Sequence, residues 1–471
     1  MVDRSLKILQ VNSSDISGGA QKVGWNLFRA YRGRGCQSSL VVGYKESDDP
    51  GVFAIQHSGT ANDWSFFWWK LYARLQRLDR NGRASRLARK LLTPRVLIDT
   101  FKGKEDFHFP GTWDLLNLTG RFPDILHCHN LHGGYFDLTA LPYLSRRVPT
   151  VLTLHDAWLL SGHCAHSLGC ERWRIGCGEC PDLSLYPDIR RDATAFNWER
   201  KRALYAKSSF YVATPSHWLM RQVEASILAL GMIEGRVIAN GVDLTVFHPA
   251  DRRATRAAMG LVPEAQILLF TANGIRENVW KDYQTLRAAI TYLAERLEGH
   301  KLIFLALGED GPAERVGQAE IRFIPYQKNP QSVARYYQAA DIYIHAARAD
   351  TFPNSVIEAL ACGAPIVATA VGGIKEQVKS LQANEALASS YGLDQATGIL
   401  TSPHDALELA MRIEQLLKDG ALRHRLSENA AKDARVRFAL ERQADDYLNW
   451  YEEIRESFIS ERREEYDLAR A

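Results

Sequence analysis

The sequence contains no run of about 18 consecutive apolar residues, the length that a membrane-spanning helix needs. Its first residues carry charges and lead straight into a strand-like pattern, so we expect no signal peptide and a cytoplasmic protein. The net charge is only +3, so we expect no nucleic-acid partner. Seven cysteines without an export signal favour reduced thiols or a metal site over disulfides.

A dinucleotide-binding fingerprint is also missing. No Gly-x-Gly-x-x-Gly follows the first predicted strand, and no acidic residue stands out at a strand end about 20 residues later. This disfavours a nicotinamide-dependent dehydrogenase. The remaining composition is ordinary for a soluble protein, with 46% hydrophobic and 24% charged residues, and a length of 471 residues predicts about two or three domains.

Strand-like and helix-like segments alternate through both halves of the chain. Such alternation predicts an α/β fold with two parallel-sheet domains. The predicted strands are 6–11, 39–42, 123–127, 151–155, 210–213, 267–270, 302–307, 321–324, 341–345, 365–368 and 398–400.

The stretch 348–365 combines several signals of a ligand site. An apolar helical face over 356–361 ends at Gly363, which places Asp350 in the loop after a strand and Glu358 about two turns into the helix. Ligands of open α/β sheets bind at this edge. Free N–H groups at a helix start bind phosphate, and carboxylates suit sugar hydroxyls, so the stretch predicts a site for a nucleotide that carries a sugar.

The spacing of Asp350 and Glu358, with 359–368 and the glycines at 372–373, resembles the signature of retaining glycosyltransferase family four, as in bacterial exopolysaccharide and colanic-acid-type sugar transferases. That signature usually has glutamate at both ends, so Asp350 keeps the charge on a shorter side chain. The resemblance implies the glycosyltransferase B fold, in which two Rossmann-like domains face each other across a cleft. The implied parts are an acceptor-side domain over 1–243, a nucleotide-sugar domain over 244–436, and a helix over 437–471 that packs back on the first domain.

The resemblance also implies an activity, the transfer of a sugar from a UDP- or GDP-sugar to a saccharide or lipid-linked saccharide in polysaccharide biosynthesis. Catalysis would need no metal or cofactor. Two other functions remain open, a nucleotide-sugar epimerase on the same scaffold and a nucleotide-sugar binding protein that does not transfer. Turnover of donor without acceptor would indicate the first, and binding without transfer the second.

Particular residues receive roles from the same resemblance. Glu358 would bind the ribose and Asp350 the donor sugar, and one of His129 and His132 would lie beside that sugar. The other implied donor-binding residues are Gly18 and Gly19 after the first strand, Arg276, Lys281, Glu309, Tyr326, and Phe352, Pro353, Asn354 and Ser355 at the helix start, with Pro353 in the first turn. A solvated surface cation is the alternative for Arg276.

Four cysteines fall within seventeen residues, on short loops that contain glycines. Such closely spaced thiolates suit a tetrahedral zinc site, here a structural one. The candidate ligands are Cys164, Cys170, Cys177 and Cys180, with His163 or His166 as substitutes. Reduced buried cysteines, or a disulfide under oxidation, remain the alternatives.

An insertion at about 60–110 has a different composition, in which aromatic residues lead into repeated arginines over 62–95. Aromatics beside arginines are typical of an interfacial helix, which would place the protein peripherally at the inner face of a membrane. A helical insertion whose aromatics pack on its own domain is the alternative.

Overall fold

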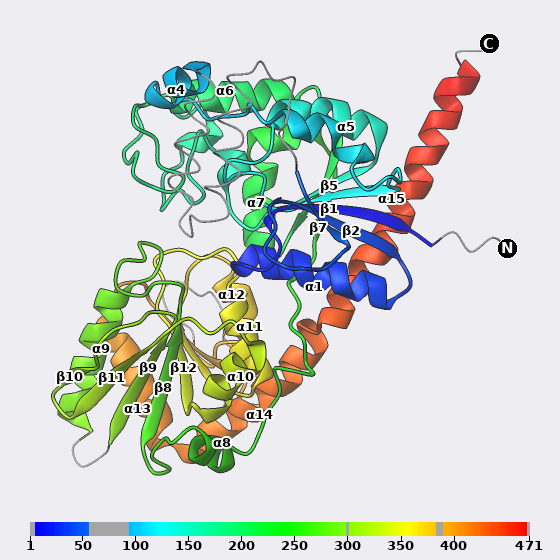
Figure 1. Ribbon diagram of the computed structural model, residues 1–471. Helices are drawn as coiled ribbons and strands as arrows, with labels where there is room; N and C mark the ends of the chain where they lie inside the picture. Colours follow the sequence, from blue (N-terminus) through cyan, green and yellow to red (C-terminus); the bar gives the residue numbers. More distant parts are fainter. Residues whose placement is uncertain (1–4, 56–93, 298–300, 383–389, 469–471) are drawn as a thin grey trace. The chain divides into compact units, whose positions relative to one another are not determined.

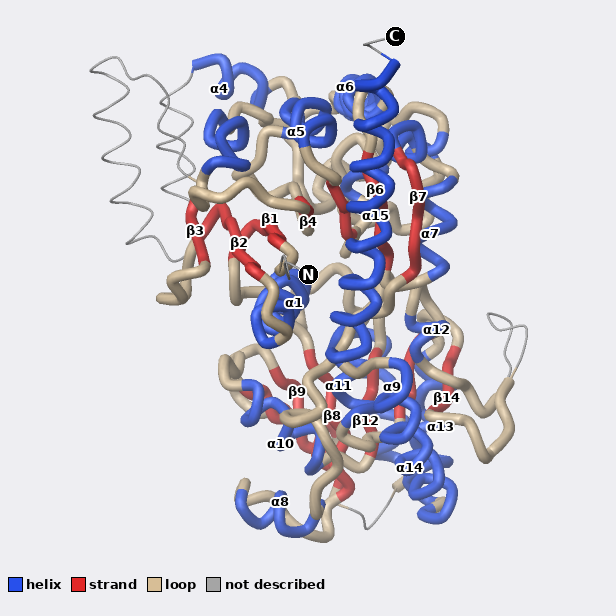
Figure 2. The backbone as a smooth tube through the Cα atoms, turned by 90° about the vertical axis from the view of Figure 1, so that its right-hand side faces the viewer, coloured by secondary structure: helices blue, strands red, loops and turns tan. Residues whose placement is uncertain are grey.

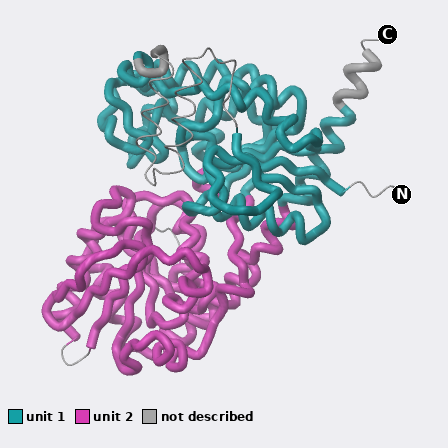
Figure 3. Tube along the Cα trace, viewed as in Figure 1, with its two compact units in different colours: residues 1–214, 220–237, 447–471 teal, residues 215–219, 238–446 magenta. Residues whose placement is uncertain are grey.

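The structure is a computed structural model that describes residues 5–55, 94–297, 301–382 and 390–468 (Figure 1). The chain forms two compact units, shown in teal and magenta in Figure 3. Unit 1 comprises Met1–Thr214, Met220–Val237 and Tyr447–Ala471, and unit 2 comprises Pro215–Leu219 and Ile238–Asp446. The aromatic and arginine-rich residues 62–93 lie outside the described residues.

Unit 1 is built on a seven-stranded parallel sheet (Figure 1). Its spatial order is β3-β2-β1-β4-β5-β6-β7, so the direction of winding reverses between β1 and β4. The central strands β4, β5 and β6 are buried along their whole length, and apolar residues make up most of each of them apart from a histidine in β4 and threonines at the ends of β5 and β6. The strands are β1 (Lys7–Ser14), β2 (Gln37–Tyr44), β3 (Val52–Ala54), β4 (Ile125–Cys128), β5 (Thr150–Thr153), β6 (Phe210–Thr214) and β7 (Met232–Val237).

Several helices in this part of the chain bury one face against the core. In α1, for example, Val23, Leu27 and Tyr31 recur every four residues and are buried. The helices are α1 (Gly19–Gly33), α4 (Pro94–Phe101), α5 (Leu141–Arg147), α6 (Thr194–Tyr205) and α7 (His217–Glu224), with 3₁₀ helices at Pro110–Asn117, Leu138–Ala140, Trp158–Leu160, Arg172–Arg174 and Ile227–Gly231.

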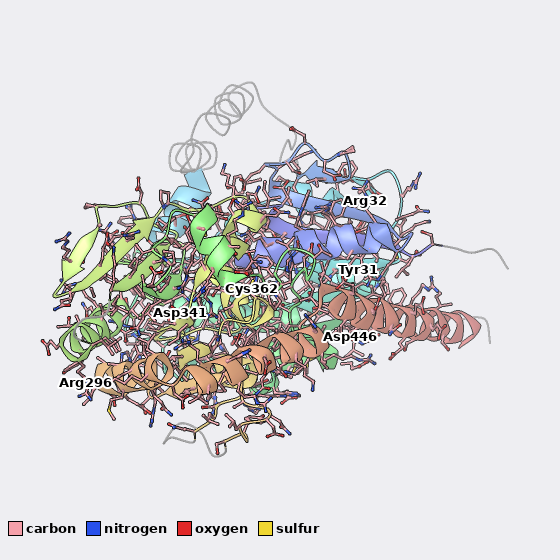
Figure 4. All side chains as sticks on the ribbon, turned by 90° about the horizontal axis from the view of Figure 1, so that it is seen from below. Tyr31, Arg32, Arg296, Asp341, Cys362 and Asp446 are labelled. Carbon is pink, nitrogen blue, oxygen red and sulfur yellow. The ribbon has the colours of Figure 1, made fainter. Side chains whose placement is uncertain are left out.

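The last helix, α15 (Leu440–Leu468), belongs to unit 1 from Tyr447 onward. There, buried tyrosines attach it to the sheet. The Tyr451 hydroxyl lies 2.6 Å from His127 Nδ1 and 3.2 Å from the hydroxyl of Tyr31, which Figure 4 labels. The Tyr447 hydroxyl lies 2.9 Å from Thr153 Oγ1. These buried polar contacts fix the register of the helix on unit 1.

Unit 2 holds a second seven-stranded sheet, in the order β10-β11-β9-β8-β12-β13-β14, in which only the edge pair β10–β11 is antiparallel among the described strands. If β10 is left out and the other six strands are renumbered 1 to 6 in chain order from β8, their spatial order is 3-2-1-4-5-6. This is the doubly wound Rossmann order. The strands are β8 (Gln266–Thr271), β9 (Leu302–Leu307), β10 (Glu314–Val316), β11 (Ala319–Ile324), β12 (Ile342–His345), β13 (Ile366–Thr369) and β14 (Gly398–Thr401).

Helices cover both faces of this sheet (Figures 1 and 2). Successive residues of β8 point to opposite faces of the sheet and belong to two separate hydrophobic cores. Ile267 and Leu269 pack on the side of α10 and α11, whereas Leu268 and Phe270 pack on the side of α9 and α13. The helices are α8 (Arg252–Ala258), α9 (Tyr283–Arg296), α10 (Pro330–Ala339), α11 (Asn354–Ala361), α12 (Ile374–Gln377), α13 (Ala406–Lys418) and α14 (Gly420–Arg437).

The predicted α/β class with two Rossmann-like sheets is confirmed. Three strands were not predicted, namely β3, β7 and β10. Each of them lies at an edge of its sheet, where a strand is half exposed and loses the apolar run that marks a central strand. Within the described part of the chain, no helix is both long and apolar enough to cross a lipid bilayer.

Candidate functional site

The switch point of the unit 2 sheet lies between β8 and β12. In open α/β sheets, ligands bind outside the carboxyl ends of the strands at this point. Lys281 follows β8 and Asp350 follows β12, and the structure brings them together, with Lys281 Nζ 2.5 Å from Asp350 Oδ2. Lys281 Nζ also lies 3.1 Å from Nε2 of His345, the last residue of β12. A cation and a carboxylate therefore meet at the predicted edge.

The charges of this group follow from its surroundings. Burial would raise the pKa of Asp350, but the positive charge of Lys281 lowers it well below its ordinary value, so the carboxylate is ionised at neutral pH. Burial, reinforced by the positive charge of Lys281, lowers the pKa of His345 to about 4, which keeps this imidazole neutral. The Lys281 and Asp350 side chains remain 12% and 17% exposed, so a ligand can reach them.

Glu358 lies on the helix that follows Asp350, as the sequence predicted. Its carboxylate Oε2 accepts a hydrogen bond of 3.0 Å from the Tyr337 hydroxyl. Two details of the prediction were wrong. Pro353 precedes the first turn of α11 instead of lying in it, because its ψ of 123° is extended. Glu358 is the fifth residue of α11, about one turn into the helix rather than two, since an α-helix has about 3.6 residues per turn.

The other predicted residues at this helix start have different surroundings. Phe352 is buried and packs on the Phe438 ring at 6.0 Å, so its side chain belongs to the core. Asn354 Oδ1 accepts a hydrogen bond from Asn240 Nδ2 at 3.0 Å. Ser355 hydrogen-bonds to Tyr343. The side chains at the helix start thus fix the loop.

The glycines after β13 pack against the backbone of the loop that carries Asp350. Gly372 has a φ of +50°, and a Cβ at this position would lie 1.9 Å from the Asp350 carbonyl oxygen. At Gly373, a Cβ would lie 1.9 Å from the Thr351 carbonyl oxygen. Only glycine lets the two loops approach this closely, so these glycines help to set the position of Asp350.

Arg276 is an ion-paired residue on the loop after β8. Its Nε bonds to Glu309, whose Oε2 also accepts the backbone N–H groups of Ile275 and Arg276 at 2.6 and 2.9 Å. The guanidinium stands 4.5 Å from the centre of the Phe323 ring. Arg276 and Glu309 thus form one group at the same sheet edge, whereas Tyr326, 46% exposed, follows β11.

In unit 1, the predicted residues also follow the two strands of a switch point. Gly18, with a φ of +101°, lies between β1 and α1, and Gly19 is the first residue of α1. His129 follows β4 and is 1% exposed. The Gln10 side-chain amide donates to His129 Nε2 at 3.1 Å, and His129 Nδ1 lies 3.0 Å from His155 Nε2. Burial lowers the pKa of His129 well below its ordinary value, so this histidine is neutral.

His132 has a different partner. Its Nε2 lies 2.7 Å from Asp156 Oδ2, and its side chain is 10% exposed. Burial would raise the pKa of Asp156, but His132 lowers it below the ordinary value. Sequence reasoning assigned no role to Asp156 and did not predict this pair. The roles of His129 and His132 toward a sugar stay predictions.

Sequence reasoning missed part of the unit 2 site altogether. It assigned no role to Thr271 or Tyr337, and it treated Tyr343 and His345 as ordinary strand residues. The available signal was their alternation, because polar residues two apart in a buried strand share one face.

The cysteine-rich segment folds around one small cavity. Cys164, Cys170, Cys177, Cys180 and His163 all line this space of about 20 Å³. His163 Nε2 lies 3.4 Å from Cys180 Sγ, and its Nδ1 lies 3.0 Å from the Pro187 carbonyl oxygen. Burial raises the pKa of Cys164, and that of Cys177 to about 12. Among the described residues, no group of three or more His, Cys, Asp or Glu side chains has a geometry that could hold a metal ion.

The structural zinc site therefore stays a prediction, which metal analysis of the purified protein checks. The prediction expects about one equivalent of zinc, lost in the variant Cys177→Ser, because thiolates are the ligands that hold a structural zinc. Cys36→Ser is the matched control, since Cys36 lies on another part of unit 1 and its loss should leave the metal content unchanged. A metal content below about a tenth of an equivalent in the parent protein rejects the site.

Comparison with known proteins identifies the family. Residues 17–246 match the model described as Glycosyltransferase Family 4, and residues 253–433 match the model described as Glycosyl transferases group 1. D-inositol 3-phosphate glycosyltransferase 2 of Catenulispora acidiphila is 33% identical over 341 residues, which cover 68% of this chain and 74% of that protein. The putative colanic acid biosynthesis glycosyl transferase WcaC of Escherichia coli K12 is 23% identical over 344 residues, or 70% of this chain and 77% of that protein.

A solved structure shares the fold. The crystal structure of Anabaena Alr3699/HepE in complex with UDP and glucose aligns over 94% of this chain and 98% of that chain, with a TM-score of 0.57 and 15% identity. Together with the two family models and the relative at 33% identity, this similarity leads to one assignment. The chain belongs to the family 4 glycosyltransferases and has their fold of two Rossmann-like domains.

Proposed function

We propose that the protein transfers a hexose-type sugar from a UDP- or GDP-sugar to a hydroxyl of a saccharide acceptor, with retention at the anomeric carbon. The proposal rests on one observation, the ion pair between Lys281 and Asp350 at the switch-point edge of the unit 2 sheet. This pair lies next to the helix that contains Glu358. This edge offers a cation for phosphate and carboxylates for hydroxyl groups.

The chemistry follows from these groups. When the bond to the sugar breaks, negative charge develops on the leaving diphosphate, and Lys281 with the N–H groups at the start of α11 stabilises it. Asp350, which Lys281 keeps ionised, accepts hydrogen bonds from the donor-sugar hydroxyls. Glu358 accepts those from the ribose. In the proposed same-face displacement the acceptor oxygen attacks on the side from which the diphosphate leaves, and the acceptor hydroxyl gives its proton to the departing phosphate oxygen, so no enzyme nucleophile takes part. The proposal requires no metal ion for the diphosphate.

Donor and acceptor are proposed from the relatives. UDP and glucose occupy the Anabaena structure, which supports a nucleotide-sugar donor. The name of the Escherichia coli relative refers to colanic acid biosynthesis, which supports a saccharide acceptor in polysaccharide assembly. A lipid-linked acceptor and peripheral contact with the inner face of a membrane rest only on the aromatic and arginine-rich composition of 62–95.

A thermal-shift screen of nucleotide sugars tests the proposal. We expect one nucleotide class to raise the melting temperature by several degrees at saturating concentration, because a ligand that binds only the folded state stabilises it. The variants Glu358→Ala and Asp350→Ala should lose this shift. Glu320→Ala is the matched control, since this carboxylate pairs with Arg322 on β11 and is 31% exposed. If both site variants bind donor as well as the parent, the assignment of the carboxylates is wrong.

Product analysis with the donor so identified completes the test. We expect release of nucleoside diphosphate only when an acceptor is present, and an NMR coupling at the new anomeric centre that matches the donor. Turnover of donor alone would indicate an epimerase, and donor binding without any turnover a binding protein. An inverted anomeric centre would contradict retention but leave sugar transfer standing.

A further inference from the structure

A line of hydrogen bonds runs from Glu358 to Lys281 between the unit 2 sheet and the helices α10 and α11. At its first end, the Tyr337 hydroxyl on α10 donates to Glu358 Oε2 at 3.0 Å. The same hydroxyl lies 3.2 Å from the Oγ1 of Thr271, the last residue of β8. Tyr337 is 1% exposed, so solvent does not replace these contacts.

The second half of the line continues along β12. Thr271 Oγ1 lies 3.0 Å from the Tyr343 hydroxyl, which lies 3.0 Å from His345 Nδ1. His345 Nε2 then meets Lys281 Nζ at 3.1 Å. Tyr343 and His345 are both 0% exposed. Four buried or half-buried side chains thus connect the residue proposed for the ribose with the residue proposed for the diphosphate.

Counting hydrogens from the Lys281 end assigns a direction to this line. An ammonium group can only donate, so His345 Nε2 must accept. The neutral imidazole then carries its single hydrogen on Nδ1 and donates it to the Tyr343 oxygen. In this tautomer, the contact of 3.4 Å between His345 Nε2 and Asp350 Oδ2 contains no hydrogen, and the ammonium of Lys281 serves both acceptors.

Counting from the Glu358 end gives the same direction. Tyr337 uses its only hydroxyl hydrogen on the carboxylate, so the hydrogen in its contact with Thr271 must come from Thr271. Thr271 in turn must accept from Tyr343. The opposite direction would leave the contact between Thr271 and Tyr337 without a hydrogen. Every contact of the line is satisfied in one arrangement only, and in this arrangement Ser355 donates its hydrogen to the Tyr343 oxygen.

We propose that Thr271, Tyr337, Tyr343 and His345 are positioning residues, which form a one-way hydrogen-bond relay that holds Lys281 and Glu358 in a fixed relation for donor binding. The inference depends on the proposed function in one respect only, namely that the ligand of this site is a nucleotide-sugar donor. Because each hydroxyl hydrogen has a single acceptor, removal of one hydroxyl in the middle allows the hydrogen bonds on either side of it to reverse their direction. His345 can then move its hydrogen to Nε2, where it competes with Lys281 for Asp350.

The variants Thr271→Val and Thr271→Ser separate this role from packing. Valine keeps the volume of threonine and removes the hydroxyl, whereas serine keeps the hydroxyl. We expect Thr271→Val to lower kcat/KM about tenfold and Thr271→Ser to stay within about twofold of the parent. In ¹⁵N NMR of the ligand-free protein, the His345 signals should report a hydrogen on Nδ1 in the parent and in Thr271→Ser, and on Nε2 in Thr271→Val. The variant His345→Gln assigns the signals.

Tyr343→Phe is a second break of the relay and should reproduce both effects of Thr271→Val. Tyr336→Phe is the matched control, because Tyr336 is the neighbour of Tyr337 on α10 and lies outside the relay. The proposal is overturned if the parent carries the His345 hydrogen on Nε2, if Thr271→Ser loses as much activity as Thr271→Val, or if Tyr336→Phe does. The NMR measurement needs no donor, so it stands even if the proposed transfer is not found.

Discussion

Replacement of Lys281 by methionine is expected to lower kcat/KM for the donor about 10²- to 10³-fold, the usual effect of losing one group that stabilises developing negative charge. Lys281 is the cation at the switch-point edge, where its Nζ bonds Asp350 at 2.5 Å and His345 at 3.1 Å. Methionine keeps the length of the side chain and removes its charge. Without that charge the diphosphate leaves less readily, and Asp350 remains as an uncompensated carboxylate next to the phosphates. Steady-state kinetics with varied donor concentration measure the effect.

Lys328→Met is the control for this variant. Lys328 is an exposed lysine of unit 2 and follows β11, so its replacement removes the same charge from the protein without touching the site. We expect the control to keep the kcat/KM of the parent within about twofold, since exposed charges at a distance are largely screened. A Lys281→Met variant that is as active as Lys328→Met would remove Lys281 from the reaction.

Acid is expected to destabilise the folded protein steeply between pH 6.5 and about 4. Burial, reinforced by Lys281, lowers the pKa of His345 to about 4, and burial also lowers those of His155 to about 4 and His127 to about 3. The folded values lie below the unfolded value of about 6.5, so the unfolded chain takes up protons first. The stability due to each neutral histidine is therefore complete above pH 6.5 and is lost as the pH falls toward the folded pKa.

The size of this effect follows from the shift. For His345 the difference between the folded and unfolded pKa corresponds to about 3 kcal/mol of unfolding free energy. Three such histidines together reach the whole stability of a typical domain, about 5–15 kcal/mol. Below pH 4 the loss continues, because Asp350 has a lowered pKa in the folded state and its stabilising charge disappears as the pH falls through that value.

Calorimetry from pH 8 to 4 measures this loss as a falling melting temperature. The variant His345→Gln should give a shallower dependence on pH, because glutamine takes up no proton. His424→Gln is the control, since His424 lies exposed on α14, and the parent dependence should persist. A melting temperature that stays constant from pH 7 to 5 would contradict the neutral, buried state of these histidines.

The sequence predicted the elements that depend on local pattern. The strand β9 is a continuous apolar run and β13 begins with one, and the stretch from Asp350 to Glu358 has a distinctive spacing of acidic residues, so both were found. The edge strand β7 was missed because its residues alternate between exposed and half-buried positions and include Glu234, Gly235 and Arg236. Such a pattern has no strong strand signal without its neighbour β6.

The side-chain relations of the site could not be predicted, because they join residues far apart in the sequence. Lys281 and Asp350 are separated by 69 residues, and Thr271 and Tyr343 by 72. Only the strand order of the sheet, with β8 beside β12, places them next to each other. Polar residues at strand ends therefore indicated where a site lies, whereas the folded structure was needed to show which of them meet.

A crystal structure with the bound nucleotide sugar tests the central claim most directly, namely that the donor binds at the switch point of the unit 2 sheet. We predict that the ribose hydroxyls hydrogen-bond to the Glu358 carboxylate and that the diphosphate contacts both Lys281 and the N–H groups at the start of α11. A donor bound elsewhere, with Glu358, Asp350 and Lys281 all free of ligand contacts, would contradict the claim.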